Sequence, residues 1–360
     1  MRDINTFRGC LVGGAAGDAL GYAVEFMKES EIFARYGKNG ITEFRLRGGV
    51  AHISDDTQMT LFTANGLLNN TADGHKVPYT KSIAQCYRDW YVTQREKFPP
   101  FGYKSSSWLM ELPELYSTRA PGMTCLSAIE SGADGSVEHP INTSKGCGGV
   151  MRVAPIGLYF SDSDMSFDQS DMLGAQAAAL THGHSLGNIP AAVLVHIIRR
   201  ICEKKNLPLD IIVSEAVGSA RRLFPDNSHI AYFTELMEKA VYLSGQELDD
   251  ISAIHRLGEG WVAEETLAVA VYCALKYSDN FEKAIIAAVN HNGDSDSTGA
   301  VTGNILGAYL GFDAIPEKFR TSLELCDVII EIADDMCRFG PEGIEGFSAF
   351  ERKYKAEKRA

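Results

Sequence analysis

The sequence predicts an all-α fold, and three observations support that prediction. Successive segments place apolar residues three or four positions apart, as on the buried face of a helix. Runs of alternating or β-branched residues, which indicate strands, are sparse. Two segments, 7–22 and 299–311, carry glycine at every fourth position, and such residues share one face of a helix. We therefore expect a bundle of roughly a dozen helices or more.

Length and charge limit the organisation and the partners. The chain has 360 residues, of which 45% are hydrophobic, enough for a large core. No Pro- or Ser-rich linker and no shift in composition divides it, so residues 1–360 are predicted to form a single domain. The 34 basic and 47 acidic residues give a net charge of −13 without a basic run, which argues against nucleic acid as a partner.

Cysteine usage and the apolar segments bear on location. Eight cysteines are scattered without a C-x-x-C pair, so reduced thiols and a cytoplasmic location are expected. The apolar segment 9–16 is followed by Asp18 and Glu25 and lacks a cleavage signature, which argues against a signal peptide. Because no apolar run approaches ~18 residues, no membrane span is predicted.

The first predicted element is the glycine-bearing helix over 7–22. Each glycine costs a helix roughly 1 kcal/mol relative to alanine, so four on one face indicate that another backbone comes close. Since the segment 299–311 has the same spacing, we expect these two helices to cross at short range. The alternative is a loose glycine-rich loop.

Between these two segments the pattern is mostly helical. A short strand-like piece is expected at 41–46, and a helix begins at Ser54 or Asp55. Trp90 and Trp108 are candidate core residues. Further helices are predicted over 80–98, 105–116, 171–180, 189–202, 208–224, 230–244, 258–276, 282–289 and 319–338.

The stretch 294–298 holds two carboxylates and three hydroxyls in five consecutive residues. Such oxygens suit a hard cation, Mg²⁺ or Ca²⁺, and they also suit the start of a helix. An EF-hand loop would need a glutamate where Ile305 stands. A phosphatase-type D-x-D-x-T loop with Asp294 as nucleophile would follow a buried strand directly. The remaining interpretation is a loop-to-helix turn that supplies ligands to a metal cluster completed from elsewhere in the chain.

A second acidic cluster is the Ser-Asp-Asp-Thr stretch at 54–57. One side chain suffices to cap a helix, and Ser54 or Asp55 can serve. Adjacent carboxylates repel each other unless a cation or hydrogen bonds compensate, so this cluster exceeds what capping requires. Asp18 and Glu25 lie at the end of the first helix and just beyond it.

A Ser/Gly-containing loop over 131–148 leads into the Ser-Lys-Gly-Cys-Gly-Gly run at 144–149. Such a run can offer backbone amides to a phosphate. It lacks the P-loop spacing, and a plain turn is the alternative. His182 and His184 stand at i and i+2, without a cysteine or third histidine close in sequence to complete a zinc site. Hydrogen-bonded histidines near a helix end are the alternative there.

Four segments, taken in order, resemble the ADP-ribosylglycohydrolase family from about residue 7 to about residue 311: 17–25, 54–57, 144–152 and 293–297. That family includes the dinitrogenase reductase-activating glycohydrolases, the animal ADP-ribosylhydrolases and a crystallin offshoot. The resemblance implies a compact orthogonal helical bundle with a two-magnesium centre at the bottom of an ADP-ribose cleft.

The resemblance also implies roles for single residues. His182 is similar to a histidine beside the distal ribose, Glu25 to a metal-linked glutamate, and Cys147 stands where some members have asparagine. Asp18 would pack behind the site. The implied ligands of the two metal ions are Ser54, Asp55, Asp56, Asp294, Asp296 and Ser297. The implied diphosphate and ribose contacts, besides His182, are Ser144, Gly146, Cys147, Gly148 and Gly149.

The implied activity is Mg²⁺-dependent hydrolysis of the bond between ADP-ribose and a modified protein side chain, with arginine expected and Mn²⁺ able to replace Mg²⁺. The partners would be an ADP-ribosylated protein and ADP-ribose. The expected catalytic groups, acting on a water that attacks C1 of the ribose, are Asp55, Asp56, Asp296 and Glu25.

Two alternative functions remain compatible with the sequence. One is a non-catalytic ADP-ribose-binding or structural protein, like the crystallin offshoot, although the intact acidic set argues against it. The other is a hydrolase of a different ADP-ribose conjugate. The residues that recognise the leaving group are expected in loops such as 95–108 or 258–266, which the motifs do not cover.

Overall fold

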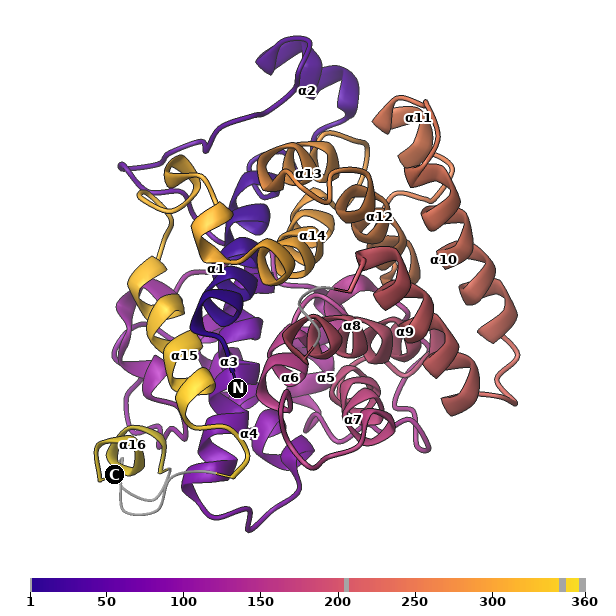
Figure 1. Ribbon diagram of the computed structural model, residues 1–360. Coiled ribbons are helices and arrows are strands. Elements are labelled where there is room, and N and C mark those ends of the chain that lie inside the picture. Colours follow the sequence, from indigo (N-terminus) through magenta and orange to yellow (C-terminus); the bar gives the residue numbers. More distant parts are fainter. Residues whose placement is uncertain (1, 204–206, 343–347, 356–360) are drawn as a thin grey trace.

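The all-α prediction is confirmed by the computed structural model, which describes residues 2–203, 207–342 and 348–355 (Figure 1). These residues form sixteen α-helices and five 3-10 helices, without a β-strand. The only strand-like pairings among them are three isolated bridges, Arg47–Val50, Ala51–Leu323 and Gly146–Val262.

Helices follow one another along the whole described chain. The α-helices are α1 (Ile4–Gly21), α2 (Glu29–Tyr36), α3 (Asp55–Ala72), α4 (Tyr79–Arg95), α5 (Met123–Glu130), α6 (Ala154–Tyr159), α7 (Phe167–Ala179), α8 (Ser185–Glu203), α9 (Leu209–Leu223), α10 (Ile230–Ser244), α11 (Asp250–Ile254), α12 (Ala263–Lys276), α13 (Phe281–Val289), α14 (Ser295–Leu310), α15 (Cys326–Arg338) and α16 (Ser348–Tyr354). The 3-10 helices are η1 (Trp108–Glu111), η2 (Pro113–Leu115), η3 (Cys147–Gly149), η4 (Phe312–Ala314) and η5 (Glu317–Phe319).

Four local predictions are wrong. The helix expected over 258–276 begins only at Ala263, since Gly258 and Gly260 before it have positive φ angles. Residues 41–46 lie in the loop between α2 and α3 and do not form a strand. The helix expected over 105–116 is replaced by η1 and η2, because Pro113 has no amide hydrogen to continue a helix. The helix expected from residue 319 begins only at Cys326, since Leu325 adopts a left-handed conformation with φ 56°.

Two further differences concern the core and the short helices. Trp90 is fully buried as predicted, whereas Trp108 is only partly buried. Five helices were not predicted from the sequence, and each has at most eight residues: α2, α5, α6, α11 and α16. Helices this short show too few turns for a clear apolar period.

The predicted crossing of the two glycine-bearing helices, α1 and α14, is confirmed, and they lie side by side in Figure 1. A Cβ atom on Gly13 would lie 2.5 Å from the carbonyl oxygen of Gly303, and one on Gly303 would lie 2.0 Å from that of Gly13. Gly17 and Gly299 make the same reciprocal contact, at 2.0 and 2.4 Å. The two backbones therefore touch along the crossing, which excludes any side chain there.

The crossing also determines where the acidic residues meet. A Cβ atom on Gly21 would lie 2.1 Å from the carbonyl oxygen of Ser295, so the C-terminal end of α1 contacts the N-terminal end of α14. The turn that follows α1 carries Glu25, and α14 begins inside the second acidic cluster. Two regions far apart in sequence thus come together at one end of the crossing.

Helix α8 is long and apolar enough, by length and composition alone, to cross a membrane, and it is the one such helix in the described ranges. Within the protein, 83% of its apolar window is buried. That burial is the setting of a core helix, and in Figure 1 α8 lies among α6, α7 and α9.

Candidate metal centre

The first acidic cluster stands at the start of α3. The Ser54 hydroxyl accepts a hydrogen bond from the Asp56 amide at 3.2 Å, so it caps this helix. Asp55 accepts one from the Gly122 amide at 3.2 Å. Both carboxylates are buried, and neither is needed for the cap.

The second acidic cluster stands at the start of α14. Asp294 caps this helix by accepting a hydrogen bond from the Ser297 amide at 3.3 Å, and Asp296 accepts one from the same amide at 2.9 Å. The turn depends on Gly293, whose φ is 129° and whose Cβ would lie 1.9 Å from the carbonyl oxygen of Glu259. Glycine at position 293 therefore permits a tight turn before α14, and the carboxylates of Asp294 and Asp296 are buried at the start of that helix.

Both clusters line one cleft of about 340 Å³. Ligand oxygens of Glu25, Asp294 and Asp296 lie within 4.8 Å of one another, and all three residues are buried. Asp55 and Asp56 line the same cleft, which therefore holds five carboxylates. No lysine or arginine of the described ranges lines it.

The electrostatics of this cleft disfavour five negative charges. Burial, and after it the charge of Asp296, raises the pKa of Asp55, Asp56 and Asp294 well above the usual range. The same two causes raise the pKa of Glu25 to about 11. A cation in the same cleft would lower these pKa values, because it stabilises the charged form of each carboxylate.

The donor set fits a hard divalent cation. Glu25 Oε2 and Asp56 Oδ2 are buried and have no hydrogen-bond partner among the described residues, whereas buried polar atoms are normally partnered. Carboxylate and hydroxyl oxygens are the ligands that Mg²⁺ and Ca²⁺ prefer. The predicted ligands Asp55, Asp56, Asp294, Asp296 and Ser297 all line the cleft, whereas Ser54 does not.

Asp18 lies behind the cleft, where it joins α1 to the start of α3. Its carboxylate accepts hydrogen bonds from the Ser54 amide at 3.0 and 3.1 Å and from the Thr57 amide at 3.1 Å. The Thr57 hydroxyl donates to it as well. Burial first, then Asp296, raises the pKa of Asp18 to about 7. With its oxygens occupied in this way, Asp18 positions the backbone of the first acidic cluster.

The predicted diphosphate loop forms a second wall of the cleft. Gly146, Cys147 and Gly148 line it, whereas Ser144 and Gly149 do not. Ser144 instead caps the loop locally, since its hydroxyl accepts from the Gly146 amide at 3.4 Å. A Cβ atom on Gly149 would lie 2.9 Å from the carbonyl oxygen of Gly187, so Gly149 permits the loop to pack on α8. Burial and then Asp294 raise the pKa of the Cys147 thiol.

His182 also lines the cleft, and its contacts keep it neutral. Its Nδ1 lies 2.8 Å from the Thr181 hydroxyl, which accepts a hydrogen bond from buried Arg152 at 2.6 Å. Burial, followed by the charge of Arg152, lowers the pKa of His182 to about 3. Because Nδ1 is engaged by Thr181, the neutral imidazole has Nε2 left to hydrogen-bond a ligand.

Phe26 and the 120–125 segment, which includes Met123, also line the cleft and were not predicted from the sequence. Phe26 is 74% exposed, and its ring stacks on Trp261 with centroids 6.3 Å apart. The position of Phe26 next to Glu25 was the one available signal. Trp261 belongs to the predicted loop 258–266, whereas the loop 95–108 does not line the cleft.

Comparison with known proteins agrees with these features. The model of the family ADP-ribosylglycohydrolase matches residues 2–343. ADP-ribosylhydrolase ARH3 of Homo sapiens is 25% identical over 350 residues, covering 90% of each chain. The ADP-ribosyl-[dinitrogen reductase] glycohydrolase of Rhodospirillum rubrum is 24% identical over 323 residues, covering 88% of this chain and 90% of its own.

A solved structure shares the fold. It is a chain of an ADP-ribosylglycohydrolase-related protein complex, with a TM-score of 0.54 and 22% sequence identity. The similarity covers 93% of this chain and 98% of that chain. The helical arrangement is therefore common to both over nearly their whole lengths.

Proposed function

The chain belongs to the ADP-ribosylglycohydrolase family, and on that premise we propose that it hydrolyses the bond between ADP-ribose and a modified arginine side chain of a protein. One observation carries the proposal: the clusters at 54–56 and 294–297 meet Glu25 in one cleft. Helix capping requires one side chain at each helix start, whereas this cleft buries five carboxylates. Arginine as the modified residue is carried over from the family resemblance.

We propose two Mg²⁺ ions, replaceable by Mn²⁺, as the cofactor of this centre. When bound, Mg²⁺ would orient the ribose hydroxyls and offset the negative charge of the cleft. Glu25 would adjoin the ions, whereas the Ser54 hydroxyl caps α3 and does not line the cleft. The other ligands would be Asp55, Asp56, Asp294, Asp296 and Ser297.

The remaining cleft residues would bind and orient the ADP-ribose. The Gly146 and Cys147 amides already donate to the Ser144 hydroxyl and the Trp261 carbonyl oxygen, so the Gly148 amide is the one that would face the diphosphate. Neutral His182 would bind a ribose hydroxyl. Asp55 or Asp56 would accept a proton from the water that attacks C1. The bond from C1 to the arginine nitrogen breaks in the same reaction, and that nitrogen leaves with a proton.

Product analysis with defined substrates tests this proposal. We expect release of ADP-ribose from an arginine-linked peptide, loss of turnover after chelation, and recovery on adding Mg²⁺ or Mn²⁺. Serine-linked peptide and O-acetyl-ADP-ribose serve as competing substrates. Turnover of one of these in place of the arginine-linked peptide would reassign the linkage. Binding of ADP-ribose with no turnover of any conjugate would indicate a non-catalytic protein.

A further inference from the structure

The segment 51–55 carries the chain into α3 and the first acidic cluster, and its backbone is held by distant residues. The Ile53 amide donates a hydrogen bond to Glu324 Oε2 at 3.1 Å, across 271 positions of sequence. The Asp55 amide donates to the carbonyl oxygen of Arg119 at 3.0 Å. The amides on either side of Ser54 are therefore fixed by two separate segments.

Those two segments are joined to each other. Arg119 Nη2 lies 3.1 Å from Glu324 Oε1, and the two side chains are 15% and 9% exposed. One carboxylate thus binds the Ile53 amide with one oxygen and the guanidinium with the other. Since the Arg119 carbonyl binds the Asp55 amide, these contacts form a closed ring around the start of the acidic cluster.

The backbone next to this ion pair is also unusual. Ala120 and Leu325, which directly follow its two members, have φ angles of 53° and 56°. Left-handed conformations are unfavourable for residues other than glycine and persist only where the surroundings impose them. Ala120 lines the acidic cleft, so one of these two turns directly adjoins the centre.

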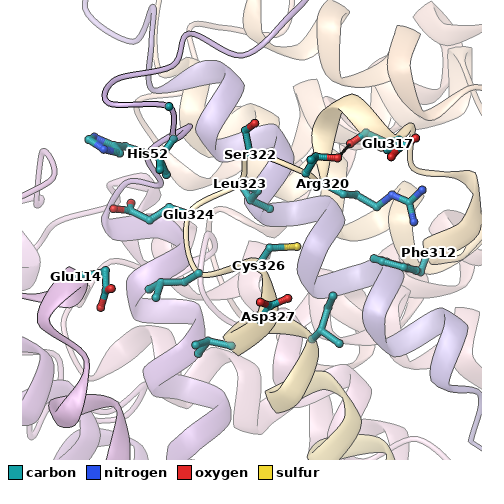
Figure 2. A pocket seen from close by; sticks show the side chains of 16 residues that line it. His52, Glu114, Phe312, Glu317, Arg320, Ser322, Leu323, Glu324, Cys326 and Asp327 are labelled. Carbon is teal, nitrogen blue, oxygen red and sulfur yellow. Dashed lines mark hydrogen bonds between the residues drawn. The ribbon is translucent and has the colours of Figure 1, made fainter.

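Glu324 itself lies outside the acidic cleft. Figure 2 shows it near His52 on the wall of another pocket, of about 750 Å³, lined largely by the 320–328 segment. The backbone of the 320–328 segment also contacts the 51–55 segment, because the Glu324 amide donates to the carbonyl oxygen of Ala51 at 3.0 Å. An effect of Glu324 on the acidic cleft therefore passes through the 51–55 backbone or through Arg119, whose neighbour Ala120 lines the cleft.

We propose that Arg119 and Glu324 are positioning residues of the metal centre, which fix the 53–55 backbone so that Asp55 and Asp56 face the second acidic cluster. This inference rests on the proposed metal-dependent function. A purely structural ion pair would change the melting temperature alone. A positioning pair would change the metal affinity of a protein that is still folded.

The test is calorimetric titration of Mn²⁺ into metal-free Glu324→Gln. The Ile53 amide and Arg119 bind different oxygens of Glu324, and glutamine replaces one of these oxygens by an NH₂ donor, so one of the two contacts is lost. The matched control is Asp334→Asn. This change breaks the 2.6 Å ion pair of Asp334 with Arg8, which joins α15 to α1. We expect Mn²⁺ affinity to fall by about 10-fold or more in Glu324→Gln, as for other residues that orient metal ligands, and to stay unchanged in the control.

Each outcome decides the proposal. Wild-type Mn²⁺ affinity in folded Glu324→Gln, or an equal loss in Asp334→Asn, would overturn it while leaving the proposed function intact. Absence of Mn²⁺ binding by the wild type would overturn both. If Glu324→Gln does not fold, Arg119→Gln replaces it, with the same expected loss of affinity and the same contradicting result.

Discussion

The α1–α14 crossing and the acidic cleft are built from the same two helices, yet they affect the stability of the metal-free protein in opposite ways. Along the crossing, glycines let backbone pack on backbone over several turns. At its end, the chain buries five carboxylates. Burial and the repulsion between them raise the pKa values of Asp55, Asp56 and Asp294. We therefore expect the crossing to stabilise the fold and the cleft to lower stability in the absence of a cation.

The fold thus supports a site that is unfavourable in itself. Binding and catalytic sites commonly lower stability, and the surrounding structure offsets the loss. Here the offset lies directly beside the site, since the rigid crossing holds Ser295 against Gly21. Changes in the crossing should therefore affect folding, and changes in the cleft should affect activity.

The largest effect is expected from Gly303→Ala in the crossing. The added Cβ would lie 2.0 Å from the Gly13 carbonyl oxygen and has only backbone to displace. We expect the free energy of unfolding to fall by about 3 kcal/mol, as for severe overpacking. Chemical denaturation measures it.

The matched control is Gly218→Ala in α9, where the nearest atom to the new Cβ is 3.8 Å away. It should gain up to about 1 kcal/mol from helix propensity. Equal stability changes in the two variants would contradict the close crossing.

The next effect is on activity. Asp296→Asn keeps the acceptor for the Ser297 amide but removes one charge from the cleft. We expect ADP-ribose release to fall by roughly 100-fold or more, since changing even a residue that only orients a metal ligand costs about 10- to 100-fold. The melting temperature without metal should rise, because a repelling charge has gone.

Exposed Asp279→Asn is the control and should change neither quantity. Full activity of Asp296→Asn would remove it from the catalytic groups. A fall in the melting temperature of its metal-free form would contradict the idea that the cleft lowers stability.

The crossing was predictable from the sequence and the shape of the cleft was not. Glycine at every fourth position predicts a helix face that another backbone can approach, and a second such segment identifies its partner. Paired carboxylates at 54–56 and 294–297 indicate oxygen ligands through their chemistry alone. These signals are local, so they can be recognised in the sequence without knowledge of the fold.

Other features depend on contacts that sequence spacing does not encode. Whether Gly149 faces a ligand or packs on α8 depends on the neighbouring helix. The stack of Phe26 on Trp261 joins residues far apart in the chain. Glu324 has no motif around it, and its link to Ile53 exists only because the chain returns to that segment.

A smaller effect is expected in the pH dependence of the metal-free protein. Burial and Asp296 raise the pKa of Asp18 from 3.8 to about 7, so protonation favours the folded state. The stability from this group is present below pH 3.8 and is lost as the pH rises to about 7. We expect the melting-temperature advantage of Asp296→Asn over wild type to widen through this interval. A constant difference would argue against coupling of the two carboxylates.

The smallest effect is expected from Gly146→Val in the loop opposite the carboxylates. The new side chain would begin 3.3 Å from His182 Nε2 and would crowd the proposed diphosphate site. We expect ADP-ribose to bind about 10-fold more weakly, a loss near 1.4 kcal/mol, with Mn²⁺ affinity unchanged. Calorimetry of both ligands checks this. Normal ADP-ribose affinity would indicate that the 144–149 loop is a plain turn.

The most direct test of the central claim, that 54–56 and 294–297 form one metal centre, is Mn²⁺ titration of the metal-free wild type beside Asp56→Asn and Asp296→Asn. If both clusters share the ions, the wild type should bind two Mn²⁺ per chain. Either variant should then lose affinity by about 10-fold or more, although the two residues stand 240 positions apart in the sequence. Wild-type stoichiometry and affinity in either folded variant would contradict the claim and leave that cluster as a helix cap.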